Sequence, residues 1–265
     1  MIRQKNVKPA RSLGAQNLDC PLVPRRRFHH DGFPMKSYRG FLLDADNTLF
    51  DYDRAEREAL TEAIRDMVPS APVDAALALY RPINAGFWRR FEEGAVSLEE
   101  LKPGRFRALL EALGAKGDPA AISNLYLGRL AQMAFLLPHA KETLERLGQR
   151  ASLCLVTNGF ASVQRGRLEK AGISGLFAAV LISEEIGVSK PDPAFFRMAV
   201  EALALAPADL LCVGDGARTD IKGARAFGID ACWYARDGAT WPEAEPAPQY
   251  TIRDLRELER FAPGL

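Results

Sequence analysis

The sequence is poor in the residues that build disulfide frameworks and metal centres with nitrogen and sulfur ligands. Its 265 residues include four cysteines and three histidines, and no two cysteines stand at the short spacing typical of a zinc site. Cys154, Cys212 and Cys232 lie in apolar runs that indicate buried strands. We therefore expect reduced thiols and a cytoplasmic protein.

The sequence also lacks long apolar runs and a strong net charge. No run approaches the length of about 20 apolar residues that a membrane-spanning helix needs. The formal net charge is +1, yet residues 1–36 alone carry eight Lys or Arg against two Asp, so the rest of the chain is slightly acidic. This balance does not favour nucleic acid as a partner. We expect a monomer or homodimer without a membrane or nucleic-acid partner.

Residues 1–36 are basic and show no periodicity. The arginines 25–27 are similar to part of a twin-arginine export signal, but His29 and His30 follow where such a signal needs an apolar segment. We predict a disordered basic extension over residues 1–36. The alternative is that the natural chain starts at Met35.

From Tyr38 onward, short apolar runs alternate with helical patterns. The runs are apolar on both faces, as parallel strands covered by helices are. Asp192-Pro193 is a typical helix start, because Asp caps the first turn and Pro suits the first helical position. The alternation predicts an α/β fold with a three-layer, doubly wound parallel sheet. The predicted strands are 40–43, 152–156, 179–182, 210–213 and 231–234, and the helices between them are 161–172, 193–204 and 217–227.

Between residues 53 and 136 this alternation stops. The region has no good strand, and apolar residues recur at helical spacing in four stretches, of which Leu60, Ile64 and Val68 mark the first. We predict four helices inserted after the first strand as a small all-helical domain. The predicted division is a basic extension over 1–36, an α/β core over 37–52 and 137–265, and the helical insertion over 53–136.

Polar residues follow four of the predicted strands, at the edge where open α/β sheets bind ligands. The first group holds Asp44 and Asp46, directly after strand 40–43. A spacing of two places both side chains on the same side of extended backbone. One carboxylate can then act as nucleophile while the other handles protons. The alternative is a plain turn that closes the strand.

Two further groups suit a phosphate. Thr157, Asn158 and Gly159 follow strand 152–156 and lead into a helix, where a hydroxyl and backbone N–H groups favour an anion. Lys190 stands just before two prolines, so its backbone is ordered and its ammonium can be aimed at a nucleophile and the transferring phosphoryl oxygens. The alternatives are a capped strand-to-helix turn and an ordinary surface lysine.

The fourth group follows strand 210–213. Asp215 can bind a metal ion, while Asp220, in the first turns of the next helix, can orient neighbouring groups. The alternative is that both only shape the turn and the helix start. Because carboxylates and carbonyls predominate and no His or Cys clusters nearby, the expected ion is Mg²⁺ rather than Zn²⁺.

Taken together, these groups resemble the four motifs of the haloacid dehalogenase-like hydrolases over about residues 38–260. The resemblance implies that the inserted helices form a cap domain. Residues 182–191 and the segments 84–94 and 104–106 are similar to the bacterial pyrimidine 5′-nucleotidase branch. That branch dephosphorylates nucleoside monophosphates such as UMP, dUMP and dTMP. The motifs that carry the resemblance are Asp44-Ala45-Asp46-Asn47-Thr48, Thr157-Asn158-Gly159, Lys190-Pro191 and Gly214-Asp215 with Asp220.

The resemblance implies a magnesium-dependent phosphatase acting on a small phosphate monoester. Asp44 is then the nucleophile that forms an aspartyl-phosphate, and Asp46 is the acid and base. The ion is implied to lie between the Asp44 carboxylate, the Asp46 backbone carbonyl and Asp215. Asp46 also favours a phosphatase over a dehalogenase, because a halide leaving group needs no proton. The phosphoryl oxygens are implied to be held by Thr157, Asn158 and the Gly159 amide.

Residues of the cap are expected to choose the substrate. Asn84 and Trp88 lie one turn apart and share a helix face, so we expect Trp88 or Phe87 to stack on a nucleobase and Asn84 to read its edge. Arg105 is a further candidate. The alternative is that these residues are packing residues of the cap. Two other functions stay open: a phosphatase for phosphoglycolate or a sugar phosphate, and a phospho-accepting switch without turnover.

Overall fold

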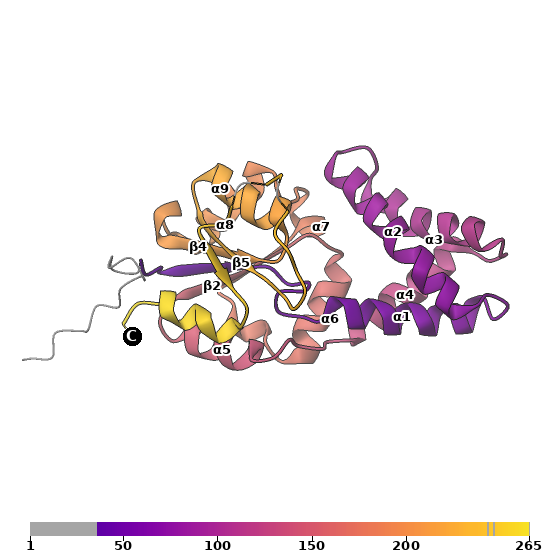
Figure 1. The fold of residues 1–265 in the computed structure, drawn as a ribbon, viewed down its shortest axis with the longest axis horizontal. Helices are drawn as coiled ribbons and strands as arrows, with labels where there is room; N and C mark the ends of the chain where they lie inside the picture. The colour runs from indigo at the N-terminus through magenta and orange to yellow at the C-terminus, as the bar shows by residue number, and fades with distance from the viewer. Residues whose placement is uncertain (1–35, 243, 246, 265) are drawn as a thin grey trace, which may run out of the picture. The chain divides into compact units, whose positions relative to one another are not determined.

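The computed structural model describes residues 36–242, 244–245 and 247–264. Of the predicted basic extension, all but Lys36 lies outside these residues. Six parallel strands form one sheet in the order β3-β2-β1-β4-β5-β6, which confirms the predicted α/β class (Figure 1). Their bounds are β1 Gly40–Leu43, β2 Ser152–Thr157, β3 Ala179–Ile182, β4 Leu210–Gly214, β5 Asp230–Tyr234 and β6 Tyr250–Ile252.

The register of the sheet brings the ends of its central strands together. Leu43, the last residue of β1, pairs with Leu155 of β2 and with Val213 of β4. The segments that follow these three strands therefore meet at one edge of the sheet. Five strands lie within one residue of their predicted bounds. The edge strand β6 is absent from the prediction, because three residues are too few to show a pattern.

Helices cover both faces of the sheet, as strands that are apolar on both sides require. Figure 1 shows α8 and α9 on one face and α5 with the final 3₁₀ helix η4 on the other. Phe195 and Phe196 of α8 are fully buried against β1, β2 and β4. Asp192 caps α8 by accepting from the Ala194 N–H (2.8 Å), and Pro193 opens the helix. The bounds are α5 Ala140–Gly148, α6 Ala161–Ala171, α7 Ser183–Ile186, α8 Pro193–Leu203, α9 Gly223–Phe227, η1 Ser174–Leu176, η2 Pro207–Asp209, the π-helical η3 Ala217–Lys222 and η4 Leu255–Phe261.

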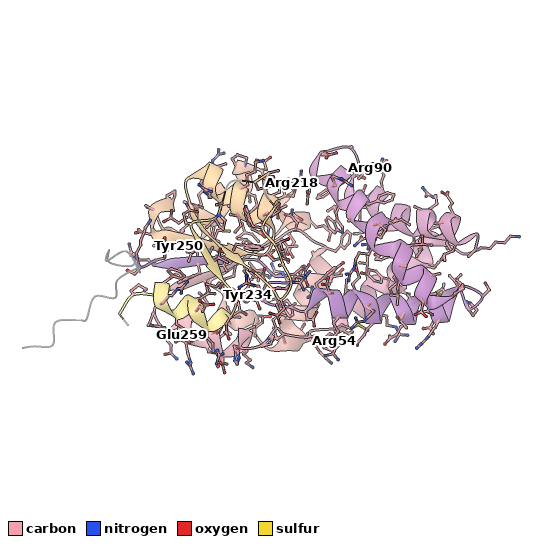
Figure 2. All side chains as sticks on the ribbon, viewed as in Figure 1. Arg54, Arg90, Arg218, Tyr234, Tyr250 and Glu259 are labelled. Carbon is pink, nitrogen blue, oxygen red and sulfur yellow. The ribbon has the colours of Figure 1, made fainter. Side chains whose placement is uncertain are left out.

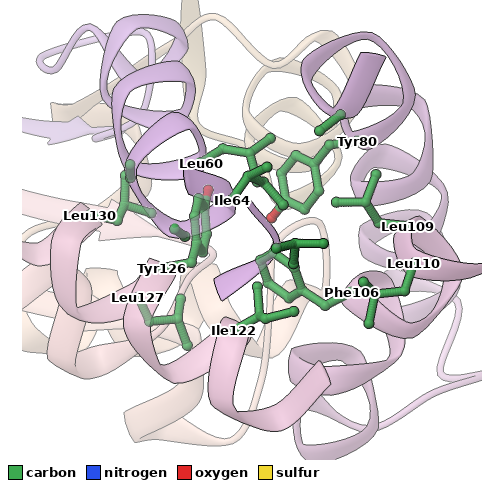
Figure 3. Packing of buried hydrophobic residues seen from close by; sticks show 14 of the residues in the cluster. Leu60, Ile64, Tyr80, Phe106, Leu109, Leu110, Ile122, Tyr126, Leu127 and Leu130 are labelled. Atoms are coloured by element: carbon green, nitrogen blue, oxygen red, sulfur yellow. The ribbon is translucent and has the colours of Figure 1, made fainter. Parts of the chain in front are cut away.

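Four helices, here called the helical module, lie between β1 and α5. They are α1 Tyr52–Met67, α2 Val73–Glu92, α3 Leu98–Leu113 and α4 Pro119–Gln132. Ser97 and Glu100 form a capping box that starts α3, and Gly114 ends it with a positive φ of 60°. Figure 3 shows Tyr80, Phe106 and Tyr126 packed together inside this module. The same cluster extends to Phe160 and Val163 of the core, so the predicted domain boundary stays a prediction.

Cys154, Cys212 and Cys232 are free thiols and buried in the strands, as predicted. Among the described residues, no helix is both long and apolar enough to cross a bilayer.

Candidate active site

Asp44 lies directly after the central strand β1. Its backbone N–H donates to the Val213 carbonyl (2.9 Å), so the chain follows the sheet for one more residue. The carboxylate is 6% exposed and accepts from Lys190 Nζ at 2.7 Å and from the Thr48 hydroxyl at 3.0 Å. Burial raises the pKa of Asp44, and the Lys190 ammonium opposes that rise. The two donors fix the carboxylate in one position at the sheet edge.

Lys190 provides the positive charge of this edge. Its ammonium is 2% exposed and donates to Asp44 Oδ1 (2.7 Å), Asp220 Oδ1 (2.6 Å) and the Val156 carbonyl (2.8 Å). All three donor hydrogens therefore have a partner. Burial alone would lower the pKa of Lys190, but Asp220 and Asp44 outweigh burial and hold it above its ordinary value. Lys190 is thus a charged residue of the site and not a surface lysine.

Asp215 and Asp220 approach from the segment after β4. The Asp215 N–H donates to Thr48 Oγ1 (3.1 Å), so one hydroxyl links Asp215 to Asp44. Asp220 is buried, and besides Lys190 it accepts from the Gly216 N–H (3.0 Å). A Cβ at Gly214 would lie 2.4 Å from the Asp220 carboxyl carbon, so only glycine lets Asp220 come this close. The sequence-predicted residues Asp44, Lys190, Asp215 and Asp220 therefore converge.

This group has the composition of a site for a hard cation. One oxygen of each of Asp44, Asp215 and Asp220 can be chosen so that all three lie within 4.8 Å of one another. Burial, with Asp44 and Asp220 nearby, raises the pKa of Asp215, which marks a surplus of buried negative charge. Both oxygens of Asp220 and both oxygens of Asp44 accept hydrogen bonds. Among the described residues no side chain or backbone group donates to the Asp215 carboxylate, so Asp215 is the readiest of the three to bind an ion. The oxygen-only donor set fits Mg²⁺.

Asp46, the second predicted catalytic carboxylate, lies on the side of the site formed by α6. Its oxygens pair with the Arg167 guanidinium and accept from Gln164 Nε2 (2.9 Å). Arg167 is fully buried and lies 4.2 Å from the Phe50 ring centre. The Asp46 side chain keeps 27% of its surface exposed and lines the same cavity as Asp44. Its predicted metal contact concerns the backbone carbonyl and stays a prediction.

The loop after β2 is tied to its neighbours. The Thr157 hydroxyl is buried and accepts from Gln164 Nε2 (3.2 Å). Asn158 makes two bonds to the backbone of Lys190, accepting from its N–H and donating to its carbonyl, both at 2.8 Å. The Gly159 N–H donates to Ser183 Oγ (3.0 Å). Asn158 thus holds the backbone that carries Lys190, while phosphate binding by this loop stays a prediction.

A cavity of 260 Å³ opens at this edge of the sheet. That volume lies near the lower end of the usual range for small-molecule sites, about 300–1,000 Å³. The sheet edge and the helical module both contribute walls. They include Asp44, Lys190 and Asp215 on one side and Asn84, Trp88 and Arg105 on the other.

Of the predicted cap residues, Asn84, Trp88 and Arg105 lie in the wall of this cavity, whereas Phe87 does not. Asn84 is buried and connects two charged residues, donating from Nδ2 to Glu56 Oε1 (3.0 Å) and accepting from Arg105 Nη1 (2.9 Å). The Trp88 ring lies 5.3 Å from that of Phe160 and is half-buried. Asn84 therefore positions Arg105, whereas base reading by Asn84 and stacking by Trp88 stay predictions.

Ion pairs join the helical module to the core at the rim of the cavity. Lys102 of α3 donates to Glu184 of α7 (2.6 Å), and Glu184 also accepts from the Ala161 N–H at the start of α6 (2.6 Å). Arg218 of η3 pairs with Glu92 at the end of α2; Figure 2 labels Arg218. These pairs bridge α3 to α7 and α2 to η3.

Some residues of the site lie outside the sequence prediction. Thr48 belongs to the quoted motif, but its bond to the Asp215 N–H needs the fold to be known. Gln164 and Arg167 lie more than 100 residues from Asp46, on a helix that the sequence predicts but whose contact with Asp46 no local pattern encodes. In the sequence, Glu56 looks like an ordinary exposed glutamate of helix α1. Only the structure shows that Glu56 is 5% exposed.

The family model for haloacid dehalogenase-like hydrolases matches residues 38–228. The HAD-hydrolase YfnB of Bacillus subtilis is 35% identical over 226 residues, covering 84% of this chain and 95% of YfnB. A crystal structure of YfnB with bound magnesium superimposes with a TM-score of 0.77, covering 84% of this chain and 97% of that one.

Two further relatives carry names of phosphatases. Pyrimidine 5′-nucleotidase YjjG of Escherichia coli is 31% identical, covering 83% of this chain and 95% of YjjG. A phosphoserine phosphatase of Thermus thermophilus is 35% identical, covering 77% of this chain and 83% of that protein. From the family model, these relatives and the site geometry, this chain belongs to the haloacid dehalogenase-like hydrolases.

Proposed function

We propose that this protein is a magnesium-dependent phosphatase for small phosphate monoesters, with a nucleoside 5′-monophosphate as its substrate. The observation that carries the proposal is the buried Asp44 carboxylate, held by Lys190 and Thr48 at the wall of a cavity. A carboxylate with fixed position and a neighbouring ammonium is suited to attack an anionic phosphorus centre.

The reaction divides into two transfers at phosphorus. An Asp44 oxygen forms a bond to phosphorus while the bond from phosphorus to the ester oxygen breaks, and the departing oxygen takes a proton from Asp46. The Asp46 carboxylate then takes a proton from water, whose oxygen attacks the aspartyl-phosphate. Asp44 is released as a carboxylate together with inorganic phosphate.

The chain's own residues prepare both transfers. Lys190 offsets the charge of Asp44 and of the phosphoryl oxygens, and Asn158 fixes the backbone of Lys190. Arg167 and Gln164 hold Asp46 at the cavity wall. Thr157 and Asn158 are proposed to bind the phosphoryl oxygens, and the Gly159 amide would join them on leaving Ser183 Oγ.

Asp44 and Asp215, with the Asp46 carbonyl, are the groups that would hold Mg²⁺. The ion supplies positive charge that reduces the repulsion between an anionic nucleophile and an anionic ester. Asp220 keeps Lys190 beside that site through its 2.6 Å bond.

A nucleotide is favoured over a smaller ester by the walls of the cavity. Trp88, Phe160 and Tyr52 offer aromatic surface, and Asn84 and Arg105 offer polar groups. The relative named as a pyrimidine 5′-nucleotidase supports this choice. The second candidate is another small metabolite such as phosphoglycolate, a sugar phosphate or phosphoserine. The relative named as a phosphoserine phosphatase supports this candidate.

The test is a panel of phosphate esters with Mg²⁺, including UMP, dTMP, phosphoglycolate, phosphoserine, ribose 5-phosphate and p-nitrophenyl phosphate. The proposal expects pyrimidine nucleotides to have the highest kcat/KM. An equal or higher rank of phosphoglycolate, phosphoserine or sugar phosphates contradicts the nucleotidase but keeps the phosphatase. Absence of turnover of every ester contradicts the phosphatase and favours a phospho-accepting switch.

A further inference from the structure

Arg105 of α3 is a buried cation whose hydrogen bonds are incomplete. It is 1% exposed, and Nη1 donates to Asn84 Oδ1 at 2.9 Å. Its Nε and Nη2 groups are buried and find no hydrogen-bond partner among the described residues. Leaving charged donors without an acceptor away from water is costly, so each such group needs an explanation, as do Nε and Nη2 of Arg167.

The surroundings of Arg105 stabilise its charge without meeting these donors. The centres of four rings, Tyr80, Phe106, Tyr126 and Phe160, lie 5.2 to 5.9 Å from the guanidinium carbon. Aromatic faces attract a cation, but they do not replace an oxygen in the plane of the guanidinium. In the described part of the chain, Arg105 has no direct ion pair either.

Glu56 is the buried acidic side chain that Asn84 connects to Arg105, and its own oxygens have other neighbours. Glu56 Oε1 accepts from the Tyr52 hydroxyl (3.2 Å) and from Asn84 Nδ2 (3.0 Å), while Oε2 lies 3.7 Å from Arg81 Nε. The hydrogen bonds that link Glu56 to Asn84 and Asn84 to Arg105 therefore hold the guanidinium by its Nη1 group. The opposite edge, with Nε–H and one Nη2–H side by side, is buried and has no hydrogen-bond partner among the described residues, and it is here called the open edge.

That open edge belongs to a residue in the wall of the active-site cavity. Arg105 shares the cavity with Asp44 and Lys190, and comes from the helical module rather than the sheet. An Nε–H and Nη2–H pair forms a rigid fork that matches one or two acceptor oxygens in a plane.

We propose that Arg105 is a specificity-determining residue, which binds acceptor atoms on the alcohol part of the substrate, remote from the phosphate that Asp44 attacks. The acceptor is a planar group with carbonyl-type oxygens: the carbonyl edge of a pyrimidine base or a carboxylate. The inference rests on the proposed phosphatase activity at Asp44 and adds the chemistry of the leaving group.

The test compares esters with and without this acceptor in the intact protein and in Arg105→Met, with Arg107→Met as the matched control. Arg107 lies on the same helix and is exposed. Arg105→Met is expected to lower kcat/KM by about 10- to 100-fold for the preferred acceptor ester, mainly through KM, because a bond to a charged donor is lost. The changes for phenyl phosphate and glycerol phosphate are expected to stay within about threefold, since neither alcohol part offers Arg105 a planar acceptor.

The arms of the panel separate the two sources of the acceptor. A loss confined to UMP and CMP assigns Arg105 to a base carbonyl, and a loss confined to phosphoserine and phosphoglycolate assigns it to a carboxylate. Equal losses for all esters, including phenyl phosphate and glycerol phosphate, would mean a purely structural role and overturn the proposal.

Two further measurements keep the proposal open to failure if Arg105→Met does not fold. Arg105→Lys keeps the charge but not the planar pair of donors. Its kcat/KM ratio of the preferred acceptor ester to glycerol phosphate is expected to be less than about a tenth of the ratio in the intact protein. In the intact protein, the preferred acceptor ester must exceed ribose 5-phosphate or glycerol phosphate in kcat/KM by at least about tenfold. Comparable values overturn the role of Arg105 while leaving the phosphatase at Asp44 untouched.

Discussion

The sheet edge and the helical module contribute to one cavity, but they differ in how many of their buried hydrogen-bond donors have a partner. At the sheet edge, Lys190 uses all three of its hydrogens on Asp44, Asp220 and the Val156 carbonyl. In the helical module, Arg105 uses only one of its guanidinium nitrogens. The comparison suggests a preorganised reaction centre beside a recognition wall that only a ligand completes.

The two regions also differ in what holds them in place. The residues around Asp44 sit on loops that extend paired strands, and the register of β1, β2 and β4 sets their spacing. Arg105 sits on a helix packed into an apolar cluster, so its position depends on side-chain packing. Substitutions at the sheet edge should therefore affect every substrate, and substitutions in the helical module should affect substrates selectively.

The largest effect is expected for Asp44→Asn. The amide is nearly the same size, so the fold should melt at a similar temperature, but the nucleophile is gone. We expect kcat to fall by more than about 10³-fold for every ester in the panel. Steady-state assays with UMP and p-nitrophenyl phosphate check this. Turnover of both esters at a rate near that of the intact protein would show that the sheet edge is not the reaction centre.

The next largest effect is expected on removing Mg²⁺, and it can be measured as a change in Tm as well as in activity. The surplus negative charge at Asp44 and Asp215 is expected to make Mg²⁺ raise the Tm of the intact protein, because the ion binds only the folded state. Chelation should remove this rise and lower kcat by about 10²-fold or more.

Asp215→Asn provides the control for the cation. It removes one partly buried charge, so the variant should melt higher than the intact protein without Mg²⁺ and lose the magnesium-dependent rise. A rise of equal size in both proteins would place the ion elsewhere.

A smaller effect is expected for the residue that holds Asp46. Arg167→Met leaves Asp46 without its buried partner, so proton transfer to the departing oxygen should suffer. We expect kcat to fall about tenfold for UMP, whose ribose oxygen needs a proton, and about twofold for p-nitrophenyl phosphate, whose leaving group does not. The exposed Arg165→Met on the same helix is the control, and it loses only its pair with Glu185.

An equal decrease for both esters in Arg167→Met would argue against a positioning role for Arg167. Circular dichroism melting of both variants tells whether the loss of a buried partner has instead weakened the fold.

The smallest effect is expected for the rim. Lys102→Met removes the ion pair with Glu184, which is partly exposed and contributes at most about 1 kcal/mol. We expect KM to change by about two- to fivefold, and by less at high salt, with Lys116→Met as an exposed control on the helical module. A large selective loss for nucleotides would move part of the recognition from Arg105 to this rim.

The convergence of Asp44, Lys190, Asp215 and Asp220 is predictable from the sequence for a simple reason. Asp44 and Asp215 come directly after short apolar runs, and Lys190 and Asp220 come from the segments that follow β3 and β4. Parallel strands bring their carboxyl ends to one edge. The bounds of five strands follow from the same runs. The strand β6 is too short to give a pattern, and it is held through its pairing with β5.

The partners of these residues are not predictable in the same way. The bonds from Asp46 to Arg167 and from Asn158 to Lys190 join positions far apart in the chain, through side-chain packing that no local pattern encodes. The open edge of Arg105 is likewise a property of its surroundings. A sequence identifies such an arginine as a candidate, and only the packed structure reveals which of its donors are free.

The most direct test of the account is to trap the covalent intermediate. The intact protein is mixed with Mg²⁺ and its best ester, quenched in acid within one turnover, digested and mapped by mass spectrometry. The account predicts one phosphoryl group on the peptide that contains Asp44, and none in Asp44→Asn. A phosphoryl group on a different residue, or release of phosphate by Asp44→Asn at the intact rate, would contradict it.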